Sequence, residues 1–174
     1  VPGVTLEHII ATDGPLEVAR AVDYAVQICN AIEHAHSQGV LHRDLRPANV
    51  LVSDKDLVKV ADFGTSRFLE IAAHGTTVIG SPPYMAPEQF RGEAVDHRAD
   101  VFALGIVAYR VLTGKPAFTG PDSASTLYNV AHVQPARPAD LAKLGEDVER
   151  ALALAPVAGR CRRLRPGRLP QRRT

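Results

Sequence analysis

Apolar residues recur with helical spacing near the start of the chain. Between residues 15 and 38 they fall at steps of three and four, at Val18, Val22, Ala25, Cys29 and Ile32. This repeat is typical of the apolar face of an amphipathic helix. Pro15 suits a first helical turn, and Gly39 suits the position just beyond the last one. The pattern therefore predicts a long helix over residues 15–38.

The middle of the chain follows a different pattern. Two short runs rich in β-branched residues, 50–52 and 57–61, flank the polar segment SDKD at 53–56. Two such runs around a polar turn are typical of a β-hairpin. Residues 65–83 are rich in Gly, Ser and Thr and show little periodicity, which indicates a long loop, either ordered or switchable.

Helical patterns return in the second half of the chain. Residues 98–113 form an apolar helical segment that Gly114 closes. A short helix is expected around 123–132 in a proline-containing stretch, and a last helix over about 140–154. The predicted fold class is therefore α+β and mostly α-helical, with one small hairpin whose flanking loops carry the polar residues.

Composition narrows the functional classes only slightly. The 174 residues suffice for one domain with a core, and 45% hydrophobic and 22% charged residues are ordinary for a soluble globular protein. The longest apolar run, at 101–109, ends at Arg110, so we expect no membrane span in this segment. Cys29 and Cys161 show no disulfide spacing, which favours free thiols and a cytoplasmic location. A net charge of +1 gives no whole-chain argument for nucleic acid.

The chemistry is concentrated around the predicted hairpin. Asp44 and Asp62 lie on its two sides and Asn49 begins it, so a tight hairpin would bring the three together. Carboxylate and amide oxygens suit Mg²⁺ with its phosphate ligands. Arg43 and Arg46 bracket Asp44 and add positive charge. A carboxylate base, a magnesium site and nearby cations are the parts that phosphoryl transfer needs.

These motifs resemble those of eukaryotic-type protein kinases. HRDLRPAN at 42–49 resembles the catalytic loop, DFG at 62–64 the magnesium motif, and APE at 86–88 the end of the activation segment. Residues 96–118 resemble the helix that follows APE. The motif sequences are most similar to those of bacterial serine/threonine kinases, and the resemblance covers roughly residues 1–154. The resemblance implies a kinase C-lobe with ATP and Mg²⁺ as cofactors and Ser or Thr hydroxyls of proteins as substrates.

The resemblance also implies roles for single residues. Asp44 would orient and deprotonate the substrate hydroxyl, and Asn49 and Asp62 would hold magnesium. Leu51 would form the floor under the adenine ring. Arg46 stands where serine/threonine kinases usually have the Lys that steadies the transferred phosphate. Arg keeps the charge but is bulkier and planar, so the geometry differs from that of the family.

Regulation is implied by the segment between DFG and APE. Arg43 would pair with a phosphorylated activation loop. Thr76 and Thr77 are the natural phosphoacceptors, because a phosphate there adds charge that Arg43 can bind. The alternative is that both threonines are ordinary loop residues.

Three further residues are assigned by the same resemblance. Ser81 matches the Thr that contacts Asp44 in serine/threonine enzymes, and SPPYMAPE at 81–88 lacks the Trp and Lys of the tyrosine-kinase version. Glu88 would form a buried ion pair with an Arg near the end of the domain. Asp100 matches the buried Asp that holds the catalytic loop, a structural rather than a catalytic role.

The family pattern also has parts that this sequence does not show. A kinase N-lobe brings a Gly-rich loop, a strand Lys and a helix Glu, and these motifs do not precede the catalytic loop here. VPGVTLEHII at 1–10 resembles the stretch just after the hinge between the lobes. We therefore expect a fragment lacking the N-lobe, weak or inactive alone, whose activity belongs to a complete parent with an N-lobe or sensor domains.

The last segment departs from the family. Residues 149–156 resemble the penultimate helix, but residues 155–174 hold seven Arg and no acid, so they carry +7 and the remainder −6. One hypothesis is a frameshift near residue 155, and the other is a natural disordered basic tail. The expected organisation is a partial kinase domain over 1–154 and a basic Arg/Pro-rich tail over 155–174.

Three other functional classes compete with the kinase interpretation. The main alternative is a non-catalytic, pseudokinase-like binding module, against which the intact Asp44, Asn49 and Asp62 argue. A small-molecule phosphotransferase shares those residues, but the segment 81–88 is typical of a peptide-binding platform. Nucleic-acid binding through the basic tail is the least favoured class, and it would show a steep dependence on salt.

Overall fold

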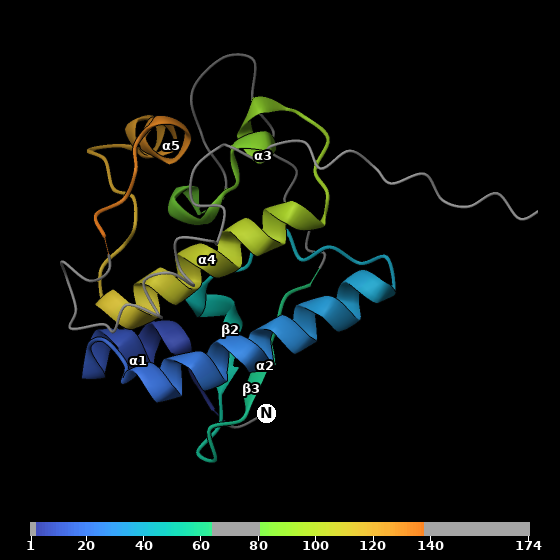
Figure 1. The fold of residues 1–174 in the computed structure, drawn as a ribbon, viewed down its shortest axis with the longest axis vertical. Coiled ribbons are helices and arrows are strands. Elements are labelled where there is room, and N and C mark those ends of the chain that lie inside the picture. Colours follow the sequence, from blue (N-terminus) through green and yellow to red (C-terminus); the bar gives the residue numbers. More distant parts are fainter. Residues whose placement is uncertain (1–2, 64–80, 138–174) are drawn as a thin grey trace, which may run out of the picture.

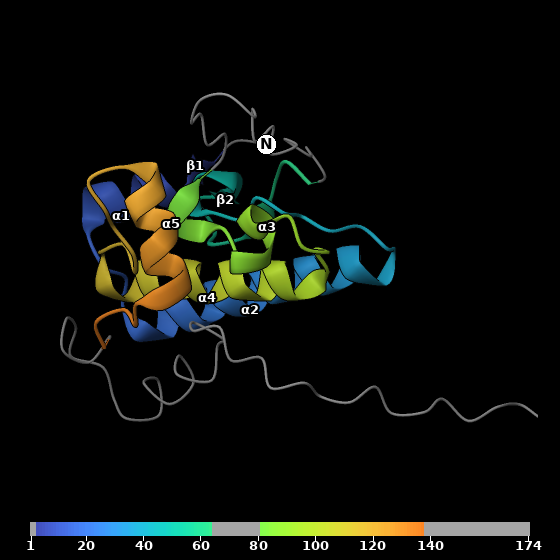
Figure 2. The same cartoon turned by 90° about the horizontal axis from the view of Figure 1, so that it is seen from above.

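The computed structural model describes residues 3–63 and 81–137. Helices and strands follow one another in the order β1 (Val4–Thr5), α1 (Leu6–Asp13), α2 (Val18–Ser37), η1 (Pro47–Asn49), β2 (Val50–Val52), β3 (Val58–Val60), η2 (Pro82–Tyr84), α3 (Pro87–Arg91), α4 (His97–Thr113) and α5 (Ser123–His132). Helices α2 and α4 pack side by side, and α4 separates α2 from α3 and α5 (Figures 1 and 2). The part of the chain described here is thus mostly helical with one small sheet.

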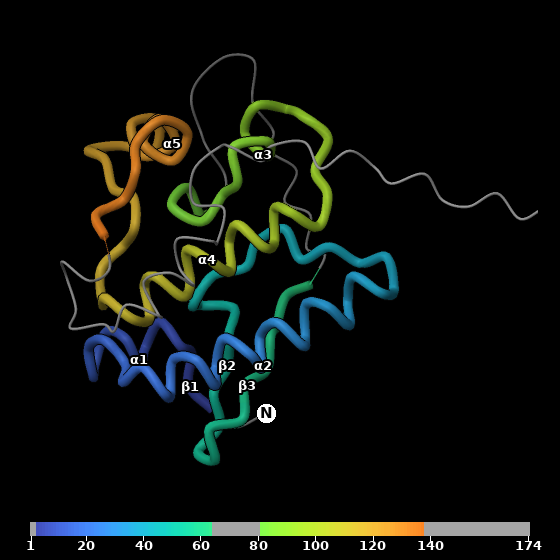
Figure 3. The backbone as a smooth tube through the Cα atoms, viewed as in Figure 1, coloured from blue at the N-terminus to red at the C-terminus, as the bar shows by residue number. Residues whose placement is uncertain are grey.

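The sheet carries the elements around the candidate site. Its strand order is β1-β2-β3, with both pairs antiparallel (Figure 3). Val50 pairs with Val60 and Val52 with Val58, so the predicted hairpin is confirmed. The second strand is shorter than expected, because only 58–60 of the predicted 57–61 is strand. Strand β1 and helix α1 were not predicted.

Helix α2 confirms the predicted long helix but corrects its buried face. It begins at Val18, after the N-cap Glu17, rather than at residue 15. Its buried residues are Ala21, Tyr24, Ile28 and Ile32. Of the predicted face, Ile32 is buried and Val18 packs against the core, whereas Val22 is 49% exposed and Cys29, a free thiol, is exposed too, so the face was predicted only in part. The large Tyr24 ring and Ile28 fill the core in place of the smaller residues one position along.

Helix α4 is the centre of the core. It contributes Ala103, Val107 and Val111 to a cluster shared with α1, α2 and the hairpin. Its other side contributes Ala99, Phe102 and Ile106 to a second cluster, which includes Val130 of α5 and Ala86. A helix that is apolar on nearly all sides is a buried one. Both clusters therefore depend on α4.

Capping residues explain why the predictions for α4 and α5 are accurate. Asp96 accepts the N–H of Arg98 at the start of α4, and Gly114 ends the helix at φ 67°. Asp122 accepts the N–H of Ser125 at the start of α5. These caps satisfy backbone groups that the helix leaves unpaired. The predicted helix at 140–154 lies outside the described residues, as does the boundary proposed at residue 154.

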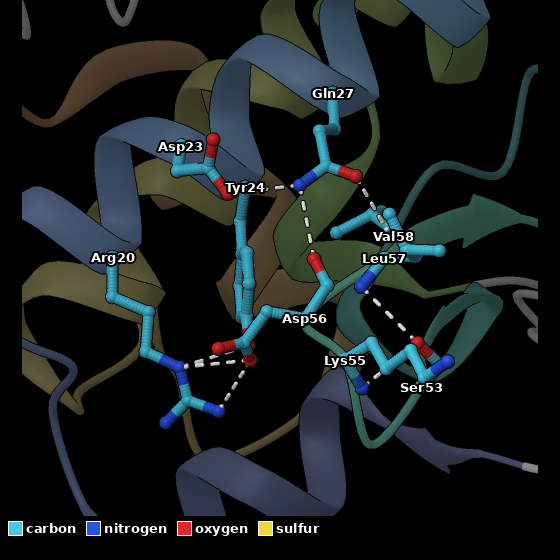
Figure 4. A network of polar contacts seen from close by, with 9 residues as sticks. All are labelled: Arg20, Asp23, Tyr24, Gln27, Ser53, Lys55, Asp56, Leu57 and Val58. Atoms are coloured by element: carbon cyan, nitrogen blue, oxygen red, sulfur yellow. Dashed lines mark hydrogen bonds and ion pairs between the residues drawn. The ribbon is translucent and has the colours of Figure 1, made fainter.

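A polar network fixes the turn of the hairpin to α2 (Figure 4). The Tyr24 hydroxyl donates to Asp56 Oδ1, and Arg20 Nη2 donates to the same oxygen at 2.8 Å. Gln27 Nε2 donates to the Asp56 carbonyl at 3.0 Å, while its Oε1 accepts the N–H of Val58 at 2.8 Å. The Tyr24 hydrogen bond and then Arg20 lower the pKa of Asp56. Desolvation and then Asp56 raise the pKa of Tyr24 to about 12.

No helix within residues 3–63 and 81–137 is both long enough and apolar enough to cross a membrane.

Removal of the Tyr24 hydroxyl should destabilise the protein at neutral pH. Tyr24→Phe keeps the buried ring but loses the bond to Asp56, so we expect its midpoint in urea titrations to lie below that of wild type. The lowered pKa of Asp56 means that this contribution is present above its ordinary value of 3.8 and is lost as the pH falls below it. Tyr128→Phe, at a residue that is 63% exposed, is the control. Equal urea midpoints for Tyr24→Phe and wild type would contradict the prediction.

Candidate active site

A buried carboxylate organises the loop that carries HRD. Asp100 of α4 is 1% exposed. Its Oδ2 accepts the backbone N–H of His42 at 2.8 Å and lies 2.7 Å from His36 Nε2, while its Oδ1 accepts the N–H of Arg43 at 2.7 Å. A buried carboxylate without such donors would cost several kcal/mol. The residue predicted to hold the catalytic loop thus contacts that loop at two consecutive amides.

His42 connects the same loop to the end of the hairpin. Its Nδ1 accepts the N–H of Asp44 at 3.3 Å, so the ring proton lies on Nε2, which donates to the Ala61 carbonyl at 3.0 Å. The side chain is fully buried and its ring lies 4.7 Å from that of Phe63. These contacts give His42 a packing role in the loop.

The hairpin brings the predicted oxygen-bearing residues to one corner. Asn49 Nδ2 donates to the Asp44 carbonyl at 2.8 Å and to Asp44 Oδ2 at 3.2 Å. The backbone carbonyl of Asn49 accepts the N–H of Ala61 at 2.8 Å. Asp62 follows Ala61 directly and has a left-handed backbone, with φ 61°. Asp44 and Asn49 therefore touch through their side chains, and Asp62 follows the residue that pairs with the backbone of Asn49.

This corner fits a hard cation together with a phosphorylated ligand. Asn49 uses its amide nitrogen for Asp44, which leaves the amide oxygen as its group for a metal. Within residues 3–63 and 81–137, no three His, Cys, Asp or Glu side chains gather into a metal-binding group. Mg²⁺ needs no such cage, because proteins usually bind it through one or two carboxylates while substrate phosphates and water supply the rest. The donor set is consistent with that mode of binding.

The side chain of Arg46 connects the catalytic loop to the segment before APE. Its Nη1 donates to Ser81 Oγ at 2.5 Å. Among the buried side-chain nitrogen and oxygen atoms of the described residues, its Nε is the one without a hydrogen-bond partner. A half-buried guanidinium with an N–H that lacks a partner can donate to an anionic ligand group. Ser81, predicted to contact Asp44, thus meets the catalytic loop through Arg46.

For the remaining predicted site residues, the structure gives a position in the fold or does not describe them. Leu51 lies in β2, half-buried between Thr5 and Lys59. Glu88 lies half-buried in α3. The Arg expected to pair with it near the end of the domain lies outside the described residues, as do Thr76 and Thr77.

Two residues of the site were missed by the sequence analysis. Gln89 Nε2 donates to the Arg43 carbonyl at 2.9 Å, and Gln89 Oε1 accepts the N–H of Ala86 at 2.9 Å. His36 was not singled out in the sequence, whereas the structure places it against Asp100. Gln89 directly follows APE, and this adjacency was the signal that could have drawn attention to it.

Known proteins match this chain over most of its length. Residues 1–150 match the family described as protein kinase domain. The serine/threonine-protein kinase PknB of Mycolicibacterium smegmatis is 42% identical over 142 residues, which are 79% of this chain and 23% of that protein. PknB of Mycobacterium leprae is 40% identical over 141 residues, with the same two coverages. A probable PknB of Bifidobacterium longum is 39% identical over 132 residues, 74% of this chain and 19% of its own length. The chain spans less than a quarter of these relatives.

Loss of the Asp100 carboxylate should release the HRD loop. Asp100→Asn replaces an acceptor oxygen with an amide that faces N–H donors, so we expect about 3 kcal/mol less stability in urea titrations. Amide exchange at His42 and Arg43 should accelerate. Asp96→Asn, at the N-cap of the same helix, should be nearly neutral because Asn caps equally well. Unchanged exchange at both loop amides would contradict the role given to Asp100.

Proposed function

Because the chain belongs to the protein kinase family, on its bacterial serine/threonine branch, we propose that these residues transfer the γ-phosphate of ATP to Ser or Thr hydroxyls of proteins. The observation that supports the proposal is the side-chain hydrogen bond from Asn49 to Asp44, together with the backbone pairing of Asn49 with Ala61, the residue before Asp62. The relatives are much longer than this chain, so the activity proposed is that of the whole protein.

Asp44 is proposed as the group that receives the substrate proton. Its carboxylate is half-buried, and Asn49 Nδ2 holds Oδ2 at 3.2 Å. A carboxylate fixed in this way can accept a hydrogen bond from a Ser or Thr hydroxyl and take its proton as the bond to phosphorus forms. Positioning of this kind supplies much of the catalysis in phosphoryl transfer.

Asn49 and Asp62 are proposed to hold Mg²⁺, and Leu51 to contact the adenine ring of ATP. When bound, the metal neutralises charge on the phosphates of the nucleotide. Asn49 suits this double task because its amide nitrogen orients Asp44 while its oxygen remains for the metal. One side chain thereby connects the base to the nucleotide.

Arg46 is proposed to steady the transferred phosphate. Its Nη1 is engaged by Ser81, but the fork-shaped guanidinium has further N–H groups, and the buried Nε–H lacks a partner among the described residues. A Lys ammonium is a point charge on a flexible stem, so it cannot offer several donors in a fixed plane. Arg46 is thus suited to contact Ser81 and an anionic phosphate at once.

Regulatory and substrate-binding roles complete the proposal. Arg43 has an exposed side chain and is proposed to pair with phosphate on Thr76 or Thr77. Ser81 belongs to the platform that would receive the substrate peptide. We propose a cytoplasmic site of action, which the free thiol of Cys29 favours.

Replacement of Asp44 should abolish phosphate transfer while leaving nucleotide binding intact. In the longest form of the protein that its gene encodes, Asp44→Asn should lower phosphate incorporation from Mg-ATP about 10³-fold, because an amide cannot take the proton. Asp54→Asn, in the exposed hairpin turn, is the matched control and should retain activity. Equal incorporation by Asp44→Asn and wild type would overturn the catalytic proposal and favour a non-catalytic binding module.

Variants of Arg46 test the phosphate contact separately. Arg46→Met should lower kcat about 10²-fold, since it removes a preorganised donor to the charged transition state. Arg46→Lys should lose less, because charge remains while the fork is lost. Arg91→Met, at an exposed residue of α3, controls for removal of a positive charge. Equal kcat values for Arg46→Met and wild type would contradict the assigned role.

A further inference from the structure

Arg43 is held in an uncommon backbone conformation. Its φ is 66°, in the left-handed region that residues other than Gly rarely adopt. Two side chains from different helices hold its two backbone polar groups. Asp100 of α4 accepts its N–H at 2.7 Å, and Gln89 of α3 donates to its carbonyl at 2.9 Å. The conformation of the residue preceding Asp44 is therefore set from two sides.

The Gln89 carboxamide can make these contacts in one orientation only. Its Nε2 meets the Arg43 carbonyl, which can only accept, and its Oε1 meets the N–H of Ala86, which can only donate. Ala86 is fully buried and immediately precedes α3. Gln89 thus joins the N-terminal end of α3 to the catalytic loop by a bridge with a fixed direction.

The bridge acts on the peptide unit that leads into Asp44. The oxygen of this unit is the Arg43 carbonyl, held by Gln89, and its nitrogen is that of Asp44, whose N–H donates to His42 Nδ1 at 3.3 Å. Because a peptide unit is planar, holding both ends fixes its rotation and hence the direction in which the Asp44 side chain leaves the backbone. The His42 end is buried, whereas the Gln89 end is half-exposed.

The other end of the bridge lies at the proposed substrate platform. Segment 81–86 folds through η2, in which the N–H of Tyr84 donates to the Ser81 carbonyl at 2.9 Å. Ala86 closes this segment and donates to Gln89. A shift of the platform would therefore move the carboxamide that holds the peptide before Asp44.

We propose that Gln89 is a positioning residue that couples the segment 81–86 to the orientation of Asp44. The inference rests on the proposed kinase function, since Asp44 is the base of that reaction. Gln89 does not touch the reacting atoms. It acts through the Arg43–Asp44 peptide, so its loss should lower kcat and leave the KM for ATP nearly unchanged.

Two substitutions separate the two halves of the bridge in the longest form of the protein that its gene encodes. In Gln89→Glu, one carboxylate oxygen still accepts the N–H of Ala86, but the other faces the Arg43 carbonyl and repels it until it is protonated. Near pH 8, kcat should fall about tenfold, the effect of one lost hydrogen bond. Relative to wild type at each pH, kcat should recover as the pH falls, because the protonated acid donates again. Gln89→Met loses both bonds and should show a similar drop in kcat that does not recover.

The control is Gln134→Glu, the same change at an exposed residue after α5, which should follow the wild-type pH profile. A kcat ratio for Gln89→Glu that stays constant with pH, or one that the control reproduces, would overturn the proposal. Loss of folding is judged by the urea midpoint, which should move little because the bridge is half-exposed.

A structural measurement keeps this inference separate from the proposed function. The carbonyl ¹³C shift of Arg43 should change in both Gln89 variants, whereas amide exchange at Ala86 should accelerate in Gln89→Met alone. If wild type transfers no phosphate but these signals respond as stated, the proposed function fails and the bridge stands. If wild type is active and the Arg43 signal ignores both variants, the bridge fails and the kinase function stands.

Discussion

The structure depends above all on one buried charge. Asp100 lies on the central helix α4, and its carboxylate is satisfied by the amides of His42 and Arg43 and by the ring of His36. An unpaired carboxylate at that depth would cost several kcal/mol, so the HRD loop cannot leave without a large penalty. The central helix α4 thereby fixes the backbone of the loop that carries the proposed base.

Other contacts hold the same corner from different directions. His42 connects the loop to the end of the hairpin through the Ala61 carbonyl, and Gln89 connects it to α3. The far end of the hairpin is fixed to α2 through Asp56. The proposed base and metal ligands lie in short irregular segments, and such segments keep a precise geometry only when elements on several sides support them. The buried contacts of Asp100 thus hold the loop firmly, whereas the half-exposed contacts of Gln89 are easier to break.

The sequence pattern predicted best those helices whose ends are defined by nearby capping residues. Helix α5 has the bounds predicted for it and begins after the N-cap Asp122, and α4 lies between Asp96 and Gly114. Strand β1 has two residues and forms only by pairing with β2, so it carries no repeat of its own. The predicted face of α2 was partly wrong because apolar residues lie on two neighbouring stripes, and the core takes the stripe that carries Tyr24 and Ile28.

In the candidate site, too, contacts between residues close in sequence could be predicted, whereas contacts between distant residues could not. The meeting of Asp44 and Asn49 follows from their spacing of five residues, which the motif displays. Gln89 and His36 act on atoms far away in sequence, and neither side chain marks its partner. Arg46 is an intermediate case. The sequence shows that Arg replaces the family's usual Lys, but it does not show which contacts this Arg makes. In the structure the planar fork of Arg46 lets Nη1 donate to Ser81 while Nε lacks a partner among the described residues, an arrangement of separate nitrogens that the single nitrogen of a Lys side chain does not offer.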